Sequence, residues 1–236
     1  MSDTGIRAMR AFRAAFPLTL PVMAGFLFLG VSYGVLMHSI GLGAGWTFLT
    51  SWLVFAGSMQ YIAITLFVAS FNPLYALAVT FMVNARHVFY GVSMLGRLDK
   101  AGKFKPYVIF AMCDETFSIL CTADIPDHVD SGWFMFFVAF LNRWYWITGS
   151  LLGAILGSLI AFNTKGLDFS LTALFAVIFL SQWLKGGNRR SAITGVACSA
   201  LCLAIFGPDG FILPAMALIL GVFILFSNKP AGGEGR

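Results

Sequence analysis

The chain has 236 residues, of which 59% are hydrophobic and only 11% are charged. A soluble domain carries about 25% charged residues, so this composition excludes an ordinary soluble fold. The net charge of +5 comes from 15 Lys and Arg residues against 10 Asp and Glu residues. Apolar stretches recur that are about 20 residues long, the length that crosses a bilayer. We therefore interpret the basic residues between them as orientation signals, and we expect no nucleic-acid partner.

Taken in chain order, the apolar segments predict an all-α polytopic membrane protein with about six to eight transmembrane segments. They cover residues 16–37, 46–70, 73–95, 106–123, 133–161, 168–184, 191–206 and 211–227. The connections are too short for a soluble domain, so a single membrane domain over residues 1–236 is expected. The first segment is too long for a signal-peptide core, and we expect a retained span that follows a cytoplasmic N-terminus.

Charges between the segments test how many of them cross. Three basic clusters are expected on the cytoplasmic side: Arg7/Arg10/Arg13, Arg97/Lys100/Lys103/Lys105 and Lys185/Arg189/Arg190. The connection with Asp124, Asp127 and Asp130 has no Lys or Arg, which favours the opposite side. If every segment crossed once, the second and third clusters would lie outside. Both conflicts disappear if segments two and six are re-entrant or broken and return to their own side.

A weak internal repeat agrees with this topology. Gly30-x-x-x-Gly34 recurs as Gly153-x-x-x-Gly157 at an offset of 123 residues, and Gln60 recurs as Gln182 at an offset of 122. The repeat halves would be residues 16–123 and 133–227, each crossing three times in opposite orientations. Secondary transporters often have such inverted repeats. Glycine spacing and apolar composition also match by chance, so coincidence is the alternative.

Ionisable and amide groups inside the segments are candidates for function, because an ionisable group there costs several kcal/mol. They are Asn84, Arg86 and His87 in segment three, Asp114 and Glu115 in segment four, and Asn142 and Arg143 in segment five. The two adjacent carboxylates diverge by about 100° on a helix, so one can serve a pathway while the other pairs with an arginine. Arg86 and Arg143 are the expected counter-ions. For Glu115 and Arg143, a purely structural ion pair is the alternative.

The histidine in segment three suggests proton transfer. Histidine titrates near neutral pH, and a desolvated carboxylate shifts toward the same range. We therefore expect His87, with Asp114 or Glu115, to carry a coupling proton or to order the groups that do.

Segment two has small and polar residues in the middle of an apolar run, namely Gly57, Ser58 and Gln60. Glycine at this depth permits a helix break, which membranes tolerate only beside protein or a water-filled cavity. A broken helix offers N–H groups to a carboxylate and carbonyl groups to a cation. An amino acid zwitterion needs both. For Gly57 alone, close helix packing is the alternative.

These motifs resemble the AzlC family, the large subunits of branched-chain amino acid exporters, from about Phe16 to Phe226. The resemblance depends on Gly30-Val-Ser-Tyr-Gly34, Ser51-Trp-Leu-Val-Phe-Ala-Gly-Ser-Met-Gln60, Asn84-Ala-Arg-His-Val-Phe-Tyr-Gly91, Asp114-Glu115-Thr-Phe and Asp168-Phe-Ser-Leu-Thr-Ala-Leu-Phe175. It implies export of valine, leucine and isoleucine, with methionine as a further candidate, across the bacterial inner membrane. It also implies a small membrane partner of the AzlD type. The candidate pathway residues are Gly57, Ser58, Gln60, Asn84, Arg86, His87, Asp114, Glu115 and Arg143.

A secondary transporter subunit coupled to protons is the function we expect. The chain has no H-E-x-x-H zinc motif, no G-x-S-x-G nucleophile motif and no phosphate-binding P-loop. We therefore expect no enzyme activity, no cofactor and no metal. The alternative is a channel, or a structural membrane subunit whose partner carries transport.

Overall fold

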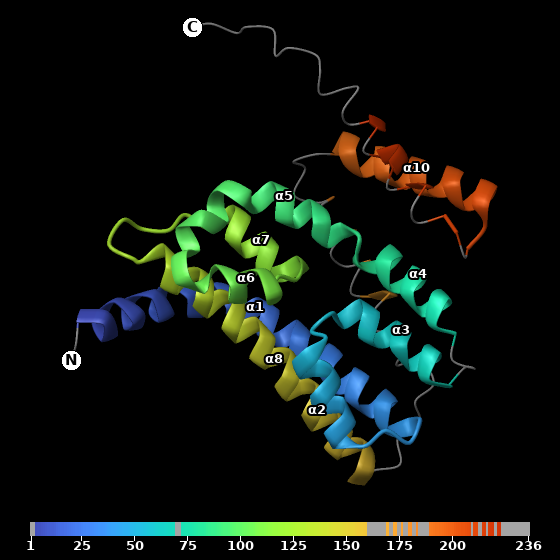
Figure 1. Cartoon of the computed structure of the whole chain (residues 1–236), viewed down its shortest axis with the longest axis horizontal. Coiled ribbons are helices and arrows are strands. Elements are labelled where there is room, and N and C mark those ends of the chain that lie inside the picture. Colours follow the sequence, from blue (N-terminus) through green and yellow to red (C-terminus); the bar gives the residue numbers. More distant parts are fainter. Residues whose placement is uncertain are drawn as a thin grey trace, which may run out of the picture. The chain divides into compact units, whose positions relative to one another are not determined.

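The computed structural model describes residues 3–68, 72–159 and 189–208, with scattered positions between 169 and 183 and between 210 and 222. Within these residues the regular structure is helical, without a strand (Figure 1). The chain divides into two compact units, Met1–Thr172 and Ala173–Arg236, described here separately. In the second unit, α10 (Arg189–Phe206) buries Cys198 and Cys202. The expected sixth segment, with Gln182, falls largely outside the described residues.

Two long helices, α1 (Asp3–Ser39) and α8 (Ser131–Leu159), pack against each other from Phe12 to His38 of α1 and run in the same direction (Figure 1). The Phe12 ring contacts the Phe137 ring near the start of both helices. A Cβ on Gly157 would lie 3.1 Å from the Cβ of His38 near their ends. We call the end where both helices begin the near end, and the other the far end. The helices run in the same direction because the residue numbers of the contacting residues increase together along both of them.

This direction corrects one sequence expectation. Two inverted halves with three crossings each would make α1 and α8 antiparallel, whereas their contacts show them parallel. The reason is a hairpin between them that the sequence interpretation counted as a crossing.

The first helical hairpin consists of α2 (Ala44–Leu53) and α3 (Gly57–Val68). It starts at the far end, and the Thr50 hydroxyl on α2 forms a hydrogen bond with the Tyr33 hydroxyl on α1. The hairpin turns at residues 54–56 and returns to the far end. This return is shown by Phe67 near the end of α3, which lines the same cavity as Met37 of α1 and Trp46 of α2. Segment two is therefore broken, and its arms start and finish at the same end of α1.

The next two helices lead back to the near end. α4 (Pro73–Asn84) begins at Asn72, whose side-chain oxygen accepts the backbone N–H of Tyr75 at 3.1 Å. Proline at the first helical position suits this start because its missing N–H would have no helical partner there. α5 (Arg86–Leu98) follows after Ala85, and the short helix η1 (Asp99–Phe104) packs on the start of α8. Together α4 and α5 cover the predicted segment three.

The second helical hairpin, α6 (Lys105–Phe110) and α7 (Asp114–Thr122), corrects the prediction that segment four crosses once. α6 runs along α8, with the Tyr107 ring 5.2 Å from the Phe136 ring. After the break at residues 111–113, α7 returns to the near end, where Arg97 of α5 donates to the carbonyl oxygens of Leu120 and Cys121. The helix thus ends at the same level at which α6 began.

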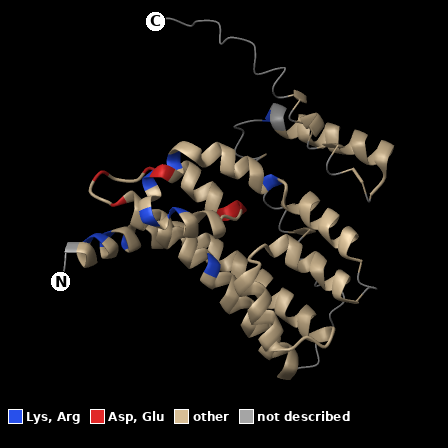
Figure 2. Ribbon diagram, viewed as in Figure 1, with Lys and Arg blue, Asp and Glu red and all other residues tan. Residues whose placement is uncertain are grey.

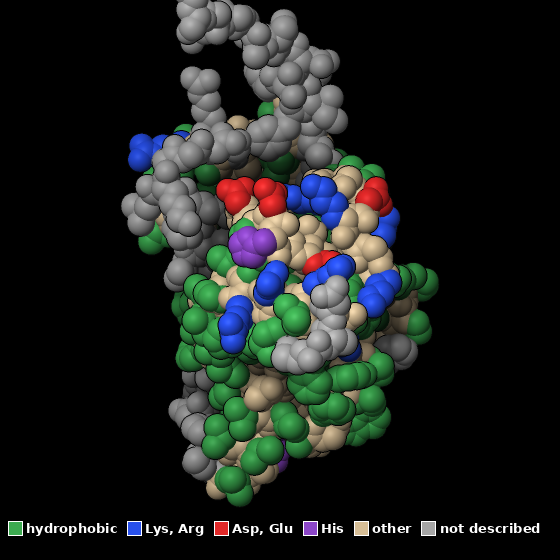
Figure 3. Space-filling model, turned by 90° about the vertical axis from the view of Figure 1, so that its left-hand side faces the viewer, with side chains coloured by type: hydrophobic (Ala, Val, Ile, Leu, Met, Phe, Trp, Pro, Cys, Tyr) green, Lys and Arg blue, Asp and Glu red, His purple; other side chains and the backbone are tan. Residues whose placement is uncertain are grey.

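The acidic connection consequently lies at the near end, not at the opposite one as its lack of Lys and Arg suggested. Asp130 accepts the backbone N–H of Trp133 at 2.9 Å, and the Trp133 ring lies 4.5 Å from the Phe104 ring beside the basic cluster of η1. Figure 3 shows acidic and basic side chains gathered together on the face at this end, and in the ribbon of Figure 2 the far ends of α1, α8 and the first hairpin carry almost no charged positions. The positive-inside rule counts Lys and Arg, so seven residues with neither carry little information.

One helix in the described part, Thr4–Ser39, is long and apolar enough by composition to cross a membrane, and Gly57–Val68, Pro73–Asn84 and Ala192–Phe206 are shorter apolar helices. The break in segment two accounts for its short helices: an apolar run that is continuous in the sequence is divided into arms of 10 and 12 residues in the first hairpin.

Candidate functional site

The turns of both hairpins and the one-residue interruption between α4 and α5, where Ala85 keeps helical φ and ψ, lie close together beside the middle of α8. The first hairpin turns at residues 54–56, α4 gives way to α5 at Ala85, and the second hairpin turns at residues 111–113. The tips of both hairpins reach Arg143, whose guanidinium lies 4.6 Å from the Trp52 ring and 4.7 Å from the Phe110 ring. The hairpins enter from opposite ends, so their tips face one another at this level.

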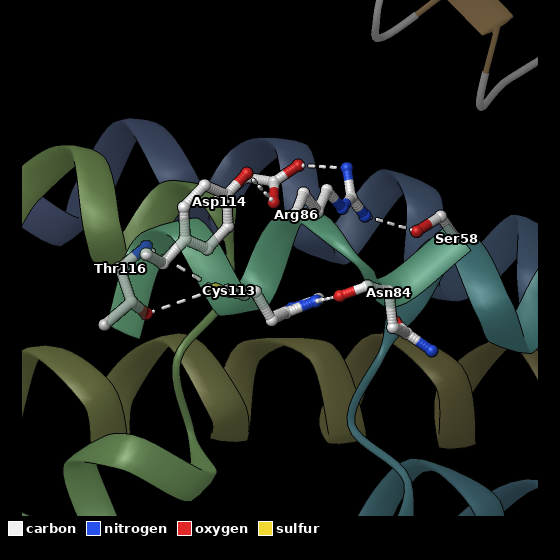
Figure 4. Close-up of polar contacts among 8 residues, drawn as sticks. Ser58, Asn84, Arg86, Cys113, Asp114 and Thr116 are labelled. Carbon is white, nitrogen blue, oxygen red and sulfur yellow. Dashed lines mark hydrogen bonds and ion pairs between the residues drawn. The ribbon is translucent and has the colours of Figure 1, made fainter. Parts of the chain in front are cut away.

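Arg86, at the start of α5, joins the second arms of the two hairpins (Figure 4). Its Nη1 donates to Oδ2 of Asp114 on α7 at 2.6 Å, and its Nη2 donates to the hydroxyl of Ser58 on α3. The Tyr90 hydroxyl donates to the other carboxylate oxygen, Oδ1, at 2.8 Å. Both charged side chains remain about a quarter exposed, 27% for Arg86 and 26% for Asp114. This ion pair is therefore reachable from outside the protein.

Local helix geometry explains why the carboxylates stand here. Asp114 and Glu115 occupy the first turn of α7, where the partial positive charge of a helix N-terminus favours anions. Cys113 is the N-cap, and its sulfur accepts the backbone N–H of Thr116 at 3.5 Å. The predicted pairing of Arg86 with Asp114 is confirmed.

His87 and Asn84 lie beside this cluster. His87 Nδ1 is 3.1 Å from the backbone oxygen of Asn84, and its ring packs edge-on against Tyr90 at 5.5 Å. Tyr90 thus links the histidine to Asp114. The amide oxygen of Asn84 is buried and has no hydrogen-bond partner in the described part of the chain. Sequence reasoning missed Tyr90, although it follows His87 by three residues on the same helix face.

Gln60 forms a second polar group at the tip of the first hairpin. Its Oε1 accepts the Trp146 indole N–H at 2.9 Å, and its Nε2 donates to Ser51 Oγ at 3.2 Å. Gln60 is 2% exposed, so both of its amide atoms depend on these contacts. Gly57 packs against the same indole, since a Cβ there would lie 3.2 Å from the Trp146 ring. Close packing, the alternative for Gly57, is what its surroundings show.

The backbone at the tip of the first hairpin is strained at Phe55, not at the glycine. Phe55 has a φ of 40°, a left-handed conformation that a bulky side chain rarely adopts. Its ring is buried, which holds it in place. Such conformations cost about 1–3 kcal/mol and cluster at functional sites. The sequence located the break within two residues but attributed it to the wrong side chain.

Arg143 does not pair with a carboxylate, which corrects its predicted role as a counter-ion. Its Nη2 donates to the backbone oxygen of Trp52 at 2.5 Å, and its guanidinium lies over the rings of Trp52, Phe110 and Tyr107. Asp114 and Glu115 are both in the described part of the chain, and neither forms an ion pair with it. The neighbouring Asn142 donates to Thr116 Oγ1 at 3.0 Å.

A separate apolar cavity of about 410 Å³ lies at the far end, between α1 and the first hairpin. Apart from Thr50 and the Trp46 indole, its lining is aliphatic or aromatic: Met37, Ile40, Leu42, Leu49, Leu53, Val54 and Phe67. The Thr50 hydroxyl is already bonded to Tyr33. The cavity therefore has no charged group for a zwitterion, and the hairpin tips are the candidate site.

Comparisons with known proteins identify the relatives of this chain. The branched-chain amino acid transport protein AzlC of Bacillus subtilis is 54% identical over 220 residues, which cover 93% of this chain and 86% of that protein. A membrane protein of Haemophilus influenzae is 40% identical over 93% of this chain and 89% of its own length. The inner membrane protein YgaZ of Escherichia coli is 25% identical over 86% of this chain and 83% of its own length.

The family comparison agrees with these relatives. No solved structure matches the chain. The family model described as AzlC protein matches residues 21–160, which include both hairpins, Arg86, Asp114 and Arg143. The chain therefore belongs to the AzlC family.

Proposed function

We propose that this chain is the large subunit of a secondary transporter that exports branched-chain amino acids across the bacterial inner membrane. The observation that carries this proposal is the Arg86–Asp114 pair, about a quarter exposed, where the second arms of both hairpins meet the start of α5. Broken helices with charged groups at their tips are the usual binding elements of secondary transporters. The 54% identical relative, named for branched-chain amino acid transport, supports the substrate class. Valine, leucine and isoleucine are the proposed substrates, with methionine as a further candidate.

The chemistry of an amino acid matches the pair at the hairpin tips. A zwitterion carries a carboxylate that suits the Arg86 guanidinium and an ammonium group that suits the Asp114 carboxylate. In the structure these two side chains pair with each other, so neither charge is left alone. A bound amino acid would replace the Arg86–Asp114 ion pair with two new ones, one between its carboxylate and Arg86 and one between its ammonium group and Asp114. Arg86 would then no longer connect Ser58 of the first hairpin to Asp114 of the second. The two ion pairs with the substrate offset the free energy that is lost when the Arg86–Asp114 pair separates.

The remaining pathway residues surround this point. Gly57, Gln60, Asn84, His87, Glu115 and Arg143 complete the proposed set. Protons are the proposed coupling ion: protonation of Asp114 would remove the charge that holds Arg86, and Tyr90 connects this carboxylate to His87. The unpartnered amide oxygen of Asn84 is a further acceptor for an ammonium group or water.

The charged near end suggests the orientation. Arg7, Arg10 and Arg13 and the cluster from Arg97 to Lys105 lie at this end, and positive residues favour the cytoplasm. We therefore place the N-terminus in the cytoplasm. A small membrane subunit of the AzlD type is the proposed partner.

Export from cells that contain this chain and the small partner tests the function. Cells loaded with a panel of amino acids should release the branched-chain ones faster, and an imposed proton gradient should change the rate. Asp114→Asn should lower this export at least about tenfold, since a charged contact is worth more than 1.4 kcal/mol. Asp99→Asn is the matched control because the Asp99–Lys105 pair is 2.7 Å long but exposed. Flux that ignores the gradient would indicate a channel, and equal loss in both variants would contradict the proposed site.

A further inference from the structure

The part of the chain from residue 44 to residue 159 repeats one plan. Each hairpin is followed by helices that run to the other end: the first by α4 and α5, and the second by α8. Val54-Phe55-Ala56 at the first tip corresponds to Ile109-Phe110-Ala111 at the second, at an offset of 55 residues. Arg86 and Arg143 then correspond at an offset of 57, and both lie at the level of the tips.

The two arginines hold different arms of the hairpins. Arg86 binds the returning arms through Ser58 on α3 and Asp114 on α7. Arg143 binds the entering arms through Trp52 on α2 and Phe110 on α6. Each hairpin tip is therefore connected to the other through two separate guanidinium groups.

The surroundings of the two connections differ in a way that separates their roles. Arg86 is 27% exposed and pairs with a side-chain carboxylate that is 26% exposed, so that a charged ligand can reach and replace this partner. Arg143 is 7% exposed, and the acceptor in its described hydrogen bond is a backbone oxygen near the C-terminus of α2. A cation is favourable at that end of a helix, and neither the Trp52 carbonyl nor the rings of Trp52 and Phe110 carry a titratable group. The contacts of Arg143 thus persist while those of Arg86 can be exchanged.

We propose that Arg143 is a positioning residue that keeps the tips of both hairpins in register while the Arg86 connection opens and closes. The role is mechanical: within the proposed pathway set, Arg143 acts through Trp52 and Phe110 on the spacing of the site at Arg86. This inference deepens the proposed transport function and rests on it for its kinetic consequence. Its structural part, the joining of two hairpins by one side chain, can be tested without transport.

Hydrogen exchange of the purified full chain in detergent tests the structural part. In Arg143→Met, exchange should rise at least about tenfold at both residues 52–58 and residues 109–116, because one guanidinium contacts both tips. Arg97→Met is the matched control, since Arg97 also binds carbonyl oxygens at a helix end but contacts only the base of the second hairpin. Its effect should stay near residues 118–123. Faster exchange at residues 52–58 alone would overturn the proposal, because Arg143 would then only cap α2.

Arg143→Lys provides a second variant in case Arg143→Met does not fold. Lysine keeps the charge and a hydrogen-bond donor but lacks the planar face that lies over the rings. Exchange should again rise at both tips, by a smaller factor. Unchanged exchange at both tips in Arg143→Lys and in a folded Arg143→Met would equally overturn the proposal.

Export kinetics test the consequence for the site. Arg143→Lys should raise the KM for a branched-chain amino acid about tenfold at equal protein level, while Arg97→Met should leave KM within about twofold. An unchanged KM beside faster exchange at both tips would overturn the kinetic consequence. If the wild-type protein shows no export, the transport function fails, whereas the exchange result still decides whether Arg143 joins the hairpins.

Discussion

Replacing Gly30 by alanine is expected to separate α1 from α8 and to destabilise the protein. A Cβ at this position would lie 2.8 Å from the backbone nitrogen of Ser150 and 2.9 Å from the carbonyl carbon of Gly149. Both partners are backbone atoms, so the contact cannot be relieved by a change of rotamer. The helices must move apart, and overpacking of this kind costs about 1–3 kcal/mol.

Gly25→Ala is the control for this substitution. Gly25 is in the same helix, and a Cβ there would meet nothing within 4 Å. Both substitutions gain the same helix propensity, about 0.5–1 kcal/mol, so their difference isolates the contact with α8. For a chain of this size, 1 kcal/mol shifts the melting temperature by about 2–4 °C, and Gly30→Ala should therefore melt about 2–12 °C below Gly25→Ala.

Thermal unfolding of the purified protein in detergent measures this difference. Gly34→Ala should melt at a lower temperature than Gly30→Ala, since its Cβ would lie still closer to the backbone of Ser150 and Ala154. Equal melting temperatures for the Gly25 and Gly30 variants would refute the reasoning, because they would mean that α1 and α8 do not meet at Gly30.

Two further predictions concern the hairpin tips. Tyr90→Phe removes the hydroxyl that donates to Asp114 and leaves the ion pair intact, so export should fall by about two- to tenfold, less than in Asp114→Asn; a larger loss would give Tyr90 a role in proton transfer. Trp146→Phe leaves the buried Gln60 Oε1 without its donor, and stability should fall by about 1–3 kcal/mol in the same thermal assay. An unchanged melting temperature would indicate that water replaces the indole N–H.

The sequence predicted those features that local chemistry determines. The break in segment two was expected from Gly57, Ser58 and Gln60, and the chain does turn there. The pairing of Arg86 with Asp114 followed from the cost of burying charge, which leaves few partners for a carboxylate. These interactions involve residues whose type alone restricts what they can contact.

The sequence did not predict the second hairpin or the partner of Arg143, for two physical reasons. The break at residues 111–113 has no glycine or proline, and its N-cap is a cysteine, which is not one of the usual capping residues. Aromatic rings and a backbone carbonyl satisfy Arg143, and such partners leave no charged signature in the sequence. An arginine in an apolar segment therefore does not by itself imply a carboxylate nearby.

One missed hairpin reversed every orientation downstream of it, and this explains why α8 was expected to run opposite to α1. Between α1 and α8 the chain passes through two hairpins that enter from opposite ends. Two successive inversions restore the original direction, as the parallel contacts of α1 and α8 require. The two neighbouring hairpins are therefore the elements with opposite orientations. One enters from the far end and the other from the near end, and their tips meet beside the middle of α8. That meeting point is where Arg86 and Arg143 lie.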